Sequence, residues 1–176
     1  MTRAAVAEME SALFSINRVI VAASLRPDCE STIGYAAEIA RRFKALLYLT
    51  YVFWPSREAE GDYQLMDKEE LAGRDRLEHL TEEARRIVPD CRAVFLIGEE
   101  ETERISGFAK EIDADLIITA THHRSVLARL FALDKAAKII GKAPCSVLVY
   151  PNNVGEFDQV KGAGWPMRKE LNERFV

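Results

Sequence analysis

The strongest constraint on the fold comes from two short apolar runs late in the chain, residues 116–118 (LII) and 147–149 (VLV). The segment between them has room for a loop and one short helix, which Gly141 and Pro144 bring to an end. A strand, a crossover and a second strand in this arrangement form a parallel pair, because a parallel connection has to cross back over the sheet. Parallel strands are buried on both faces, so this segment predicts an α/β fold with helices on both faces of the sheet.

The rest of the chain repeats this alternation of strand and helix signals. Runs of aliphatic and β-branched residues predict strands, and apolar residues spaced three and four apart predict helices. The first helix has its apolar face at Ile33, Ala36, Ala37, Ala40 and Phe43. Strands are expected at residues 19–23, 45–53, 93–97, 116–118 and 146–150, and helices at 28–43, 65–88, after Gly98 and in the last crossover. Five strands that alternate with four helices indicate a doubly wound five-stranded parallel sheet.

Length and composition fit one compact domain with an extension at each end. The chain has 176 residues, 48% hydrophobic and 30% charged, which suffices for a full core. The domain is expected at residues 18–151. Residues 1–17 form an N-terminal helical extension, whose apolar residues have helical spacing: Val6, Met9, Leu13 and Ile16. The glycine-containing C-terminal extension, residues 152–176, fits either packing on a neighbour or disorder.

The charge pattern argues against several partners. The chain has 28 acidic and 24 basic residues and a formal charge of −4. No block of Lys and Arg is interleaved with aromatic residues, so nucleic acid is not an expected partner. The apolar runs are strand-sized, and Glu8 and Glu10 interrupt the N-terminal segment, so neither a membrane span nor a signal peptide is predicted. The expected location is cytoplasmic.

Side chains suited to catalysis or metal binding are few and scattered. The three cysteines, Cys29, Cys91 and Cys145, are too widely spaced for a disulfide framework or a metal cluster. Cys29 and Ser24 are candidate nucleophiles, but the sequence supplies no evident base or orienting acid for either. A hydrolase is therefore the weakest functional hypothesis. We expect a protein that is not an enzyme and has no catalytic residues.

The last third of the chain resembles the C-terminal half of a universal stress protein. The similar segments are residues 113–118 (DADLII), Thr121-His122 with Arg124-Ser125, and residues 143–149 (APCSVLV). The resemblance implies the adenine nucleotide alpha hydrolase-like fold, with a sheet in the order 3-2-1-4-5 and helices on both faces. The switch point of such a sheet lies between the first and fourth strands, where ligands bind. A ligand is then expected between residues 22–26 and residues 120–124.

A glycine pattern marks the members of this family that bind ATP: a glycine, two residues, a second glycine, nine residues, a third glycine and then Ser or Thr. In this sequence the four positions are Ala120, His123, Leu133 and Asp134. Glycines let backbone N–H groups close on phosphate oxygens, and the hydroxyl adds a donor. The Asp134 carboxylate near a phosphate adds repulsion of roughly 4 kcal/mol at 4 Å and an effective dielectric near 20. These departures predict that ATP binds weakly or not at all, and no cofactor is expected.

Other candidate binding residues come from the same resemblance. Nucleotide-binding relatives usually end the first strand in an Asp that reaches the adenine, and Ser24 stands at that place. Tyr51 and Val52 match positions that line the base pocket, although both also fit ordinary strand packing. The full candidate set is Ala22, Ser24, Val52, Ala120, Thr121, His123, Arg124, Leu133 and Asp134.

Two histidines and an arginine leave alternatives open. His123 and Arg124 can supply donors and positive charge in place of the glycines, so a protein that binds ATP or AMP is the alternative to a regulatory protein with a degenerate nucleotide site. Neighbouring His122 and His123 lack a third ligand at a metal-like spacing, so no metal site is expected. Nucleotidyltransferases on a related sheet need two histidines near the end of the first strand, and residues 22–32 contain none.

The last strand predicts an oligomer. Ser146 to Tyr150 is apolar and would lie at a sheet edge, where unpaired backbone groups invite a second chain. Relatives of this fold commonly pair there, which implies a homodimer with strand five against strand five. The alternative is that the C-terminal extension covers this edge. Any further protein partner is unidentified from the sequence.

Overall fold

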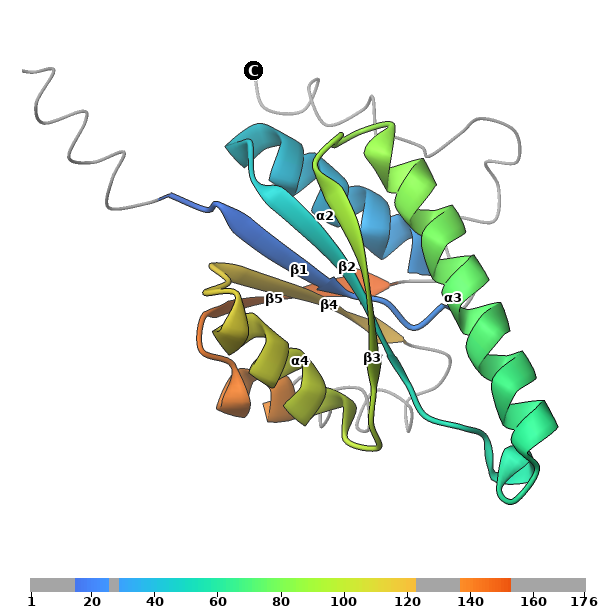
Figure 1. Ribbon diagram of the computed structural model, residues 1–176. Helices are drawn as coiled ribbons and strands as arrows, with labels where there is room; N and C mark the ends of the chain where they lie inside the picture. Colours follow the sequence, from blue (N-terminus) through green and yellow to red (C-terminus); the bar gives the residue numbers. More distant parts are fainter. Residues whose placement is uncertain (1–14, 26–28, 123–136, 153–176) are drawn as a thin grey trace, which may run out of the picture.

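The computed structural model describes residues 15–25, 29–122 and 137–152. Five parallel strands form one sheet in the order β3-β2-β1-β4-β5 (Figure 1). The strands are β1 (Arg18–Ala22), β2 (Leu46–Phe53), β3 (Cys91–Ile97), β4 (Leu116–His122) and β5 (Ser146–Asn152). The helices are α2 (Cys29–Phe43), α3 (Tyr63–Arg85) and α4 (Glu101–Glu111), with a short 3-10 helix η1 (Arg57–Ala59) and a helical stretch at residues 137–142. The predicted class and strand order are confirmed.

The central strand β1 shows why the sheet is built from continuous apolar runs. It pairs with β2 on one side and with β4 on the other. Val19, Ile20 and Val21 are all fully buried, although successive side chains point to opposite faces. Both faces are therefore covered, which is the condition under which a strand loses its polar alternation.

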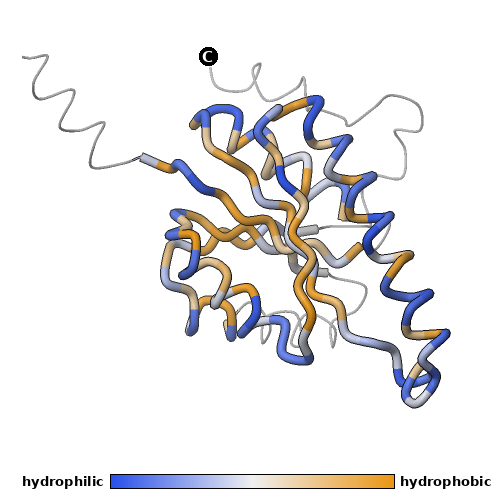
Figure 2. Tube along the Cα trace, viewed as in Figure 1, coloured by the Kyte–Doolittle hydropathy of each residue, from blue (hydrophilic) through white to orange (hydrophobic). Residues whose placement is uncertain are grey.

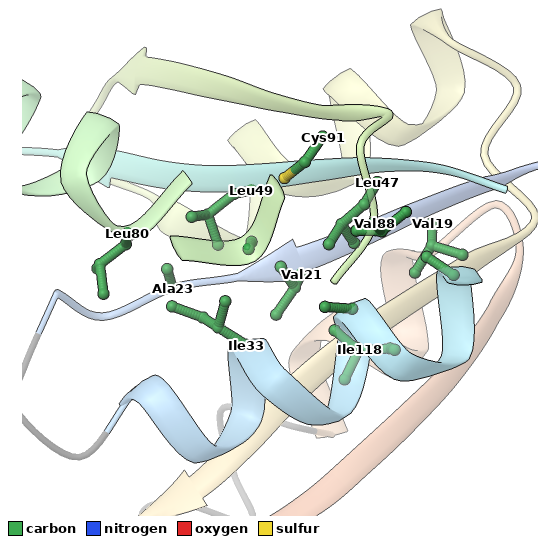
Figure 3. Packing of buried hydrophobic residues seen from close by; sticks show 14 of the residues in the cluster. Val19, Val21, Ala23, Ile33, Leu47, Leu49, Leu80, Val88, Cys91 and Ile118 are labelled. Carbon is green, nitrogen blue, oxygen red and sulfur yellow. The ribbon is translucent and has the colours of Figure 1, made fainter. Parts of the chain in front are cut away.

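Helices α2 and α3 cover one face of the sheet. Ile33 of α2 and Leu80 of α3 belong to the same buried cluster as Val21 and Leu49 of the strands (Figure 3). Much of α3 is hydrophilic, whereas the strands of the sheet are mostly hydrophobic (Figure 2). The amphipathic pattern of α3 thus directs one apolar stripe onto the sheet.

The opposite face is covered by α4 and by residues 137–142, which lie close together in Figure 1. Ile105 and Ala109 of α4 and Ile139 pack with Ile20 and Ile117 of the central strands. The two buried clusters lie on opposite faces of the same strands, so helices cover both faces, as expected for a doubly wound sheet.

The end of α2 contains one wrong prediction. Phe43 was expected on the buried face but is 48% exposed. The helix ends at this residue: the amide of Ala45 donates to the carbonyl of Ala40 at 2.8 Å, and that of Lys44 donates to Arg41 at 3.2 Å. Lys44 has a φ of 55°, so this is a Schellman ending with a lysine in the left-handed position. The chain turns away there, which leaves Phe43 beyond the core.

Both predicted extensions fall mostly outside the described residues, and their boundaries stay predictions. Within residues 15–17 the backbone has no regular secondary structure, so the predicted N-terminal helix does not extend to Ile16. Ile16 instead packs, partly buried, against the cluster on the α2 face. Across the three described ranges, no helix has both the length and the apolar composition needed to cross a bilayer.

Candidate functional site

A pocket opens at the carboxyl ends of β1 and β4, the switch point of this sheet. Its walls come from the end of β1, the first turns of α2, the first residue of α4 and the end of β4. The described lining residues are Ala22, Ala23, Ser24, Cys29, Thr32, Ile33, Glu101, Thr119 and Ala120. The side chains at the ends of β1 and β4 are mostly small, and this leaves the space that forms the pocket.

The β1 wall continues beyond the strand as irregular backbone at residues 23–25. The amide of Ala23 donates to the carbonyl of Thr50 at 2.8 Å, which continues the contact with β2 beyond the strand itself. Leu25 then adopts a φ of 54°, a left-handed conformation that is costly for a branched side chain. Between them, the Oγ of Ser24 is buried and has no hydrogen-bond partner within the described part of the chain. This hydroxyl oxygen lies at the pocket wall but has almost no accessible surface.

The α2 wall carries a second buried hydroxyl. Thr32 is only 2% exposed, and its Oγ1 also lacks a hydrogen-bond partner among residues 15–25, 29–122 and 137–152. A buried polar group without a partner costs about 1–3 kcal/mol, so such groups usually mark a place where water or a ligand binds. Two of them, Ser24 and Thr32, line this one pocket.

The α4 wall contributes a carboxylate. Glu101 is the first residue of α4, where the helix dipole favours negative charge. The loop before it is tied to β2, since the amide of Gly98 donates to the carbonyl of Phe53 at 3.0 Å. Burial raises the pKa of the Tyr51 phenol on β2, and the negative charges of Glu101 and Glu69 raise it further. The field of Glu101 therefore reaches the strand that was predicted to line a base pocket.

The predicted site residues divide into four groups. Ala22, Ser24 and Ala120 come together in the pocket. Val52 lies on β2, partly buried against the cluster on the α4 face, and does not line the pocket. Thr121 belongs to β4, where only its backbone is described. The other four, His123, Arg124, Leu133 and Asp134, lie outside the described residues.

Sequence reasoning missed three polar lining residues, Thr32, Glu101 and Thr119. The burial of Thr32 could have been predicted, because it lies four residues before Ala36 and therefore on the same, buried face of α2. Thr119 continues the apolar run of β4 and is 4% exposed. Glu101 had no distinguishing signal, since it stands in a run of acidic residues at 99–101 that reads as a solvated helix start.

Neither Cys91 nor Cys145 has the lowered pKa of an activated nucleophile. Burial raises the pKa of Cys91 to about 11 and also raises that of Cys145. Both thiols are therefore protonated near neutral pH. Cys29 is buried at the pocket wall. In the described part of the chain, no three His, Cys, Asp or Glu side chains are grouped so that they could hold a metal ion.

Comparison with known proteins decides the family. The family model of the universal stress protein family matches residues 15–151. The chain belongs to the universal stress protein family. The match spans all five strands and the pocket, so the resemblance seen in the last third of the sequence extends over the whole domain. Comparison with curated protein sequences gave no match.

Solved universal stress proteins have the same fold. A universal stress protein from Lactobacillus plantarum superposes with a TM-score of 0.64 at 19% identity, over 77% of this chain and 98% of that one. A universal stress protein from Archaeoglobus fulgidus, solved in complex with dAMP, gives 0.58 at 20% identity over 77% and 98%. Another, solved in complex with cAMP, gives 0.60 at 16% identity over 79% and 99%. At these identities the likeness establishes the fold.

Proposed function

We propose that this protein is a non-catalytic regulatory member of the universal stress protein family, whose degenerate nucleotide site binds ATP weakly or not at all. It acts in the cytoplasm through contacts with a protein partner or a small ligand. The observation that carries the proposal is the composition of the pocket wall: Ser24 and Ala120 line it where nucleotide-binding relatives have an Asp and a glycine.

Each of these two residues weakens a nucleotide contact. Ser24 can form one hydrogen bond, but it lacks the charge of the carboxylate that reaches the adenine in relatives. Ala120 carries a Cβ at the end of β4, where a glycine would let the backbone approach a phosphate. The neighbouring Glu101 adds a negative charge to the same pocket.

The sequence after β4 also disfavours a triphosphate. His123, Leu133 and Asp134 occupy the remaining three positions of the glycine pattern. Two side chains then stand where backbone amides should meet phosphate oxygens, and a carboxylate replaces a hydroxyl donor. All three changes disfavour a triphosphate.

A nucleotide-binding protein is the second candidate function. Two of the similar structures hold cAMP or dAMP, which are adenine nucleotides with one phosphate. His123 and Arg124 can supply donors and positive charge to such a phosphate. This candidate differs from the first in one measurable respect, because it requires a nucleotide to stabilise the folded protein.

The proposed assembly is a homodimer through β5. This strand lies at one edge of the sheet, with Val147, Leu148 and Val149 at its centre. An apolar edge strand with unpaired backbone groups favours addition of a second chain. The same strand of a second copy, related by a two-fold axis, satisfies these groups symmetrically.

Thermal unfolding with Mg-ATP, AMP and no ligand separates the two candidates. A ligand at 100 times its dissociation constant stabilises a protein by about 2.7 kcal/mol. We expect no upward shift in the melting temperature of the wild type with Mg-ATP at 1 mM. The variant with His123→Gly, Leu133→Gly and Asp134→Ser should gain a shift. A wild-type shift of several degrees with Mg-ATP, abolished by Arg124→Ala, would favour the nucleotide-binding candidate.

A further inference from the structure

An apolar stripe runs along one flank of α2. Its members, Tyr35, Ile39 and Phe43, are spaced four residues apart, so they follow one side of the helix. Tyr35 is 39% exposed, Phe43 is 48% exposed, and Ile39 is only partly buried. The other apolar side chains of α2 are buried against the sheet. These three residues, the α2 stripe, are therefore the apolar surface that α2 leaves accessible.

The α2 stripe continues onto β5. The ring of Tyr35 contacts the ring of Tyr150, with centroids 4.8 Å apart. Leu148 lies two residues before Tyr150, on the same side of the strand, and packs partly buried against the cluster on the α2 face. The other flank of α2 meets α3, where Arg76 pairs with Glu30 at 2.9 Å. The flank of α2 next to β5 is thus an apolar shelf, with a helix on one side and an edge strand below.

A segment with a matching pattern follows β5 in the sequence. In the C-terminal extension, Met167, Leu171 and Phe175 recur four residues apart, directly after Pro166. Proline is favoured in the first turn of a helix, so residues 166–176 are predicted to form an amphipathic helix. These residues lie outside the described part of the chain. A helix of about three turns is marginal alone in water, so its apolar side needs a surface to pack on.

The C-terminal extension starts beside the α2 stripe. Strand β5 ends at Asn152, two residues after Tyr150, and the ring of Tyr150 contacts Tyr35. Residues 153–166 can span up to about 45 Å when extended. Helix α2 has 15 residues and is therefore about 22 Å long. The connecting residues are long enough for a helix at residues 166–176 to lie along any part of α2.

We propose that residues 166–176 form a helix that packs along the α2 stripe of the same chain, over the face of β5. The apolar side of this helix covers the stripe, and the charged residues between its apolar positions, such as Lys169 and Glu173, face solvent. The helix contacts the face of β5 and not its edge, so the edge backbone stays accessible for the proposed dimer. The inference goes beyond the proposed function, because it does not depend on nucleotide binding.

Limited trypsin digestion of the full-length protein tests the proposal. Arg168 and Lys169 are cleavage sites within the proposed helix, and Lys161 is a site before it. Phe43→Ser removes the exposed end of the α2 stripe without changing the sequence that trypsin cleaves. It should speed cleavage after Arg168 and Lys169 by about fivefold or more, because the helix is released, and leave cleavage after Lys161 unchanged. Unchanged cleavage within the helix overturns the proposal.

Tyr63→Ser is the matched control. Tyr63 is an aromatic residue of α3, 79% exposed, that does not belong to the α2 stripe. This variant should keep the wild-type rate at all three sites. Equal acceleration by Phe43→Ser and Tyr63→Ser would show that the protection does not come from the stripe, and the proposal would be wrong.

The concentration dependence of the digestion identifies which chain supplies the helix. Packing within one chain gives the same protection over an about hundredfold range of protein concentration, because no association step is involved. Protection that grows with protein concentration would show that a second copy covers the α2 stripe, which overturns the proposal.

Leu171→Asp tests the other side of the contact and leaves the described residues unchanged. It places a charge at the centre of the apolar side, so the helix should leave the α2 stripe. Binding of the dye ANS, which reports exposed apolar surface, should then rise by about twofold or more in fluorescence. Asn172→Asp adds the same charge on a different side of the helix and should match the wild type. Equal fluorescence of the two variants would contradict the proposed packing.

Discussion

Asp115 and Arg18 hold the two central strands together at the end opposite the pocket. The backbone amide of Arg18 donates to the Asp115 carboxylate at 2.9 Å, and the amide of Asp115 donates to the Arg18 carbonyl at 3.0 Å. The same carboxylate oxygen accepts from the amide of Asn17 at 2.7 Å. Nearly one hundred residues separate these partners in sequence, so the contact fixes the start of β1 against β4.

Replacing Asp115 should therefore destabilise the domain. Hydrogen bonds to a charged group contribute about 1.5–3 kcal/mol each, and an amide retains part of that. We expect Asp115→Asn to lower the free energy of unfolding by about 1–3 kcal/mol in urea titrations. Asp113→Asn is the matched control, since Asp113 is exposed at a φ of 48°, which asparagine tolerates. Equal effects of the two substitutions would contradict this role.

Lys44 is a site where a single substitution should stabilise the protein. It occupies the left-handed position after α2, with a φ of 55°, and its side chain is exposed. Glycine is the residue that best fits this conformation. Lys44→Gly should raise the free energy of unfolding by about 0.5–1 kcal/mol, whereas Lys44→Ala should not, because alanine keeps the left-handed strain. A destabilised glycine variant would show that the lysine side chain matters more than the backbone.

Glu38 predicts a pH dependence of stability. Its carboxylate accepts from Arg41 and Arg42 at 2.7–2.9 Å, and these contacts lower its pKa from 4.5 to about 2. A carboxyl group whose pKa is lower in the folded than in the unfolded protein stabilises the fold at pH values above its unfolded pKa. The contribution of Glu38 is therefore lost as the pH falls from about 4.5 toward 2.

Urea titrations of wild type and Glu38→Gln at several pH values measure this effect. Because the two ion pairs lie on the surface, we expect a difference of about 0.5–1 kcal/mol at pH 7. The difference should shrink below pH 4.5 and vanish near pH 2. A difference that stays constant across this range would contradict the assignment.

The proposed dimer can be broken at β5. Val149 is partly buried near the middle of this edge strand. A charge on an edge strand opposes pairing, so Val149→Lys should convert a dimer to a monomer in sedimentation equilibrium. Val149→Thr keeps a branched strand residue and should remain dimeric. A wild type that sediments as a monomer, or a lysine variant that still dimerises, would contradict the proposed interface.

The buried strands were predictable because their whole surroundings are apolar. Residues 19–21 and 116–118 sit at the centre of the sheet, where both faces exclude polar side chains. Helix ends were harder. The α3 helix begins at Tyr63, two residues before the predicted start, because the Asp62 carboxylate accepts from the amides of Gln64 and Leu65 and caps it.

The pocket was only partly predictable. The strand ends that carry Ala22, Ser24 and Ala120 follow from the fold, since parallel strands meet at one edge. Glu101 and Thr32 come from helix starts, and their approach to that edge depends on how α4 and α2 pack on the sheet. No local pattern in the sequence encodes such packing. The acidic run therefore gave no binding signal, and the helical spacing of Thr32 indicated burial without indicating a pocket.

Isothermal titration of Mg-ATP into the full-length wild type tests the proposed loss of triphosphate binding most directly. We predict no measurable heat for the wild type and a gain of binding for the variant with His123→Gly, Leu133→Gly and Asp134→Ser. Wild-type binding in the low micromolar range, about −8 kcal/mol, would contradict the proposal.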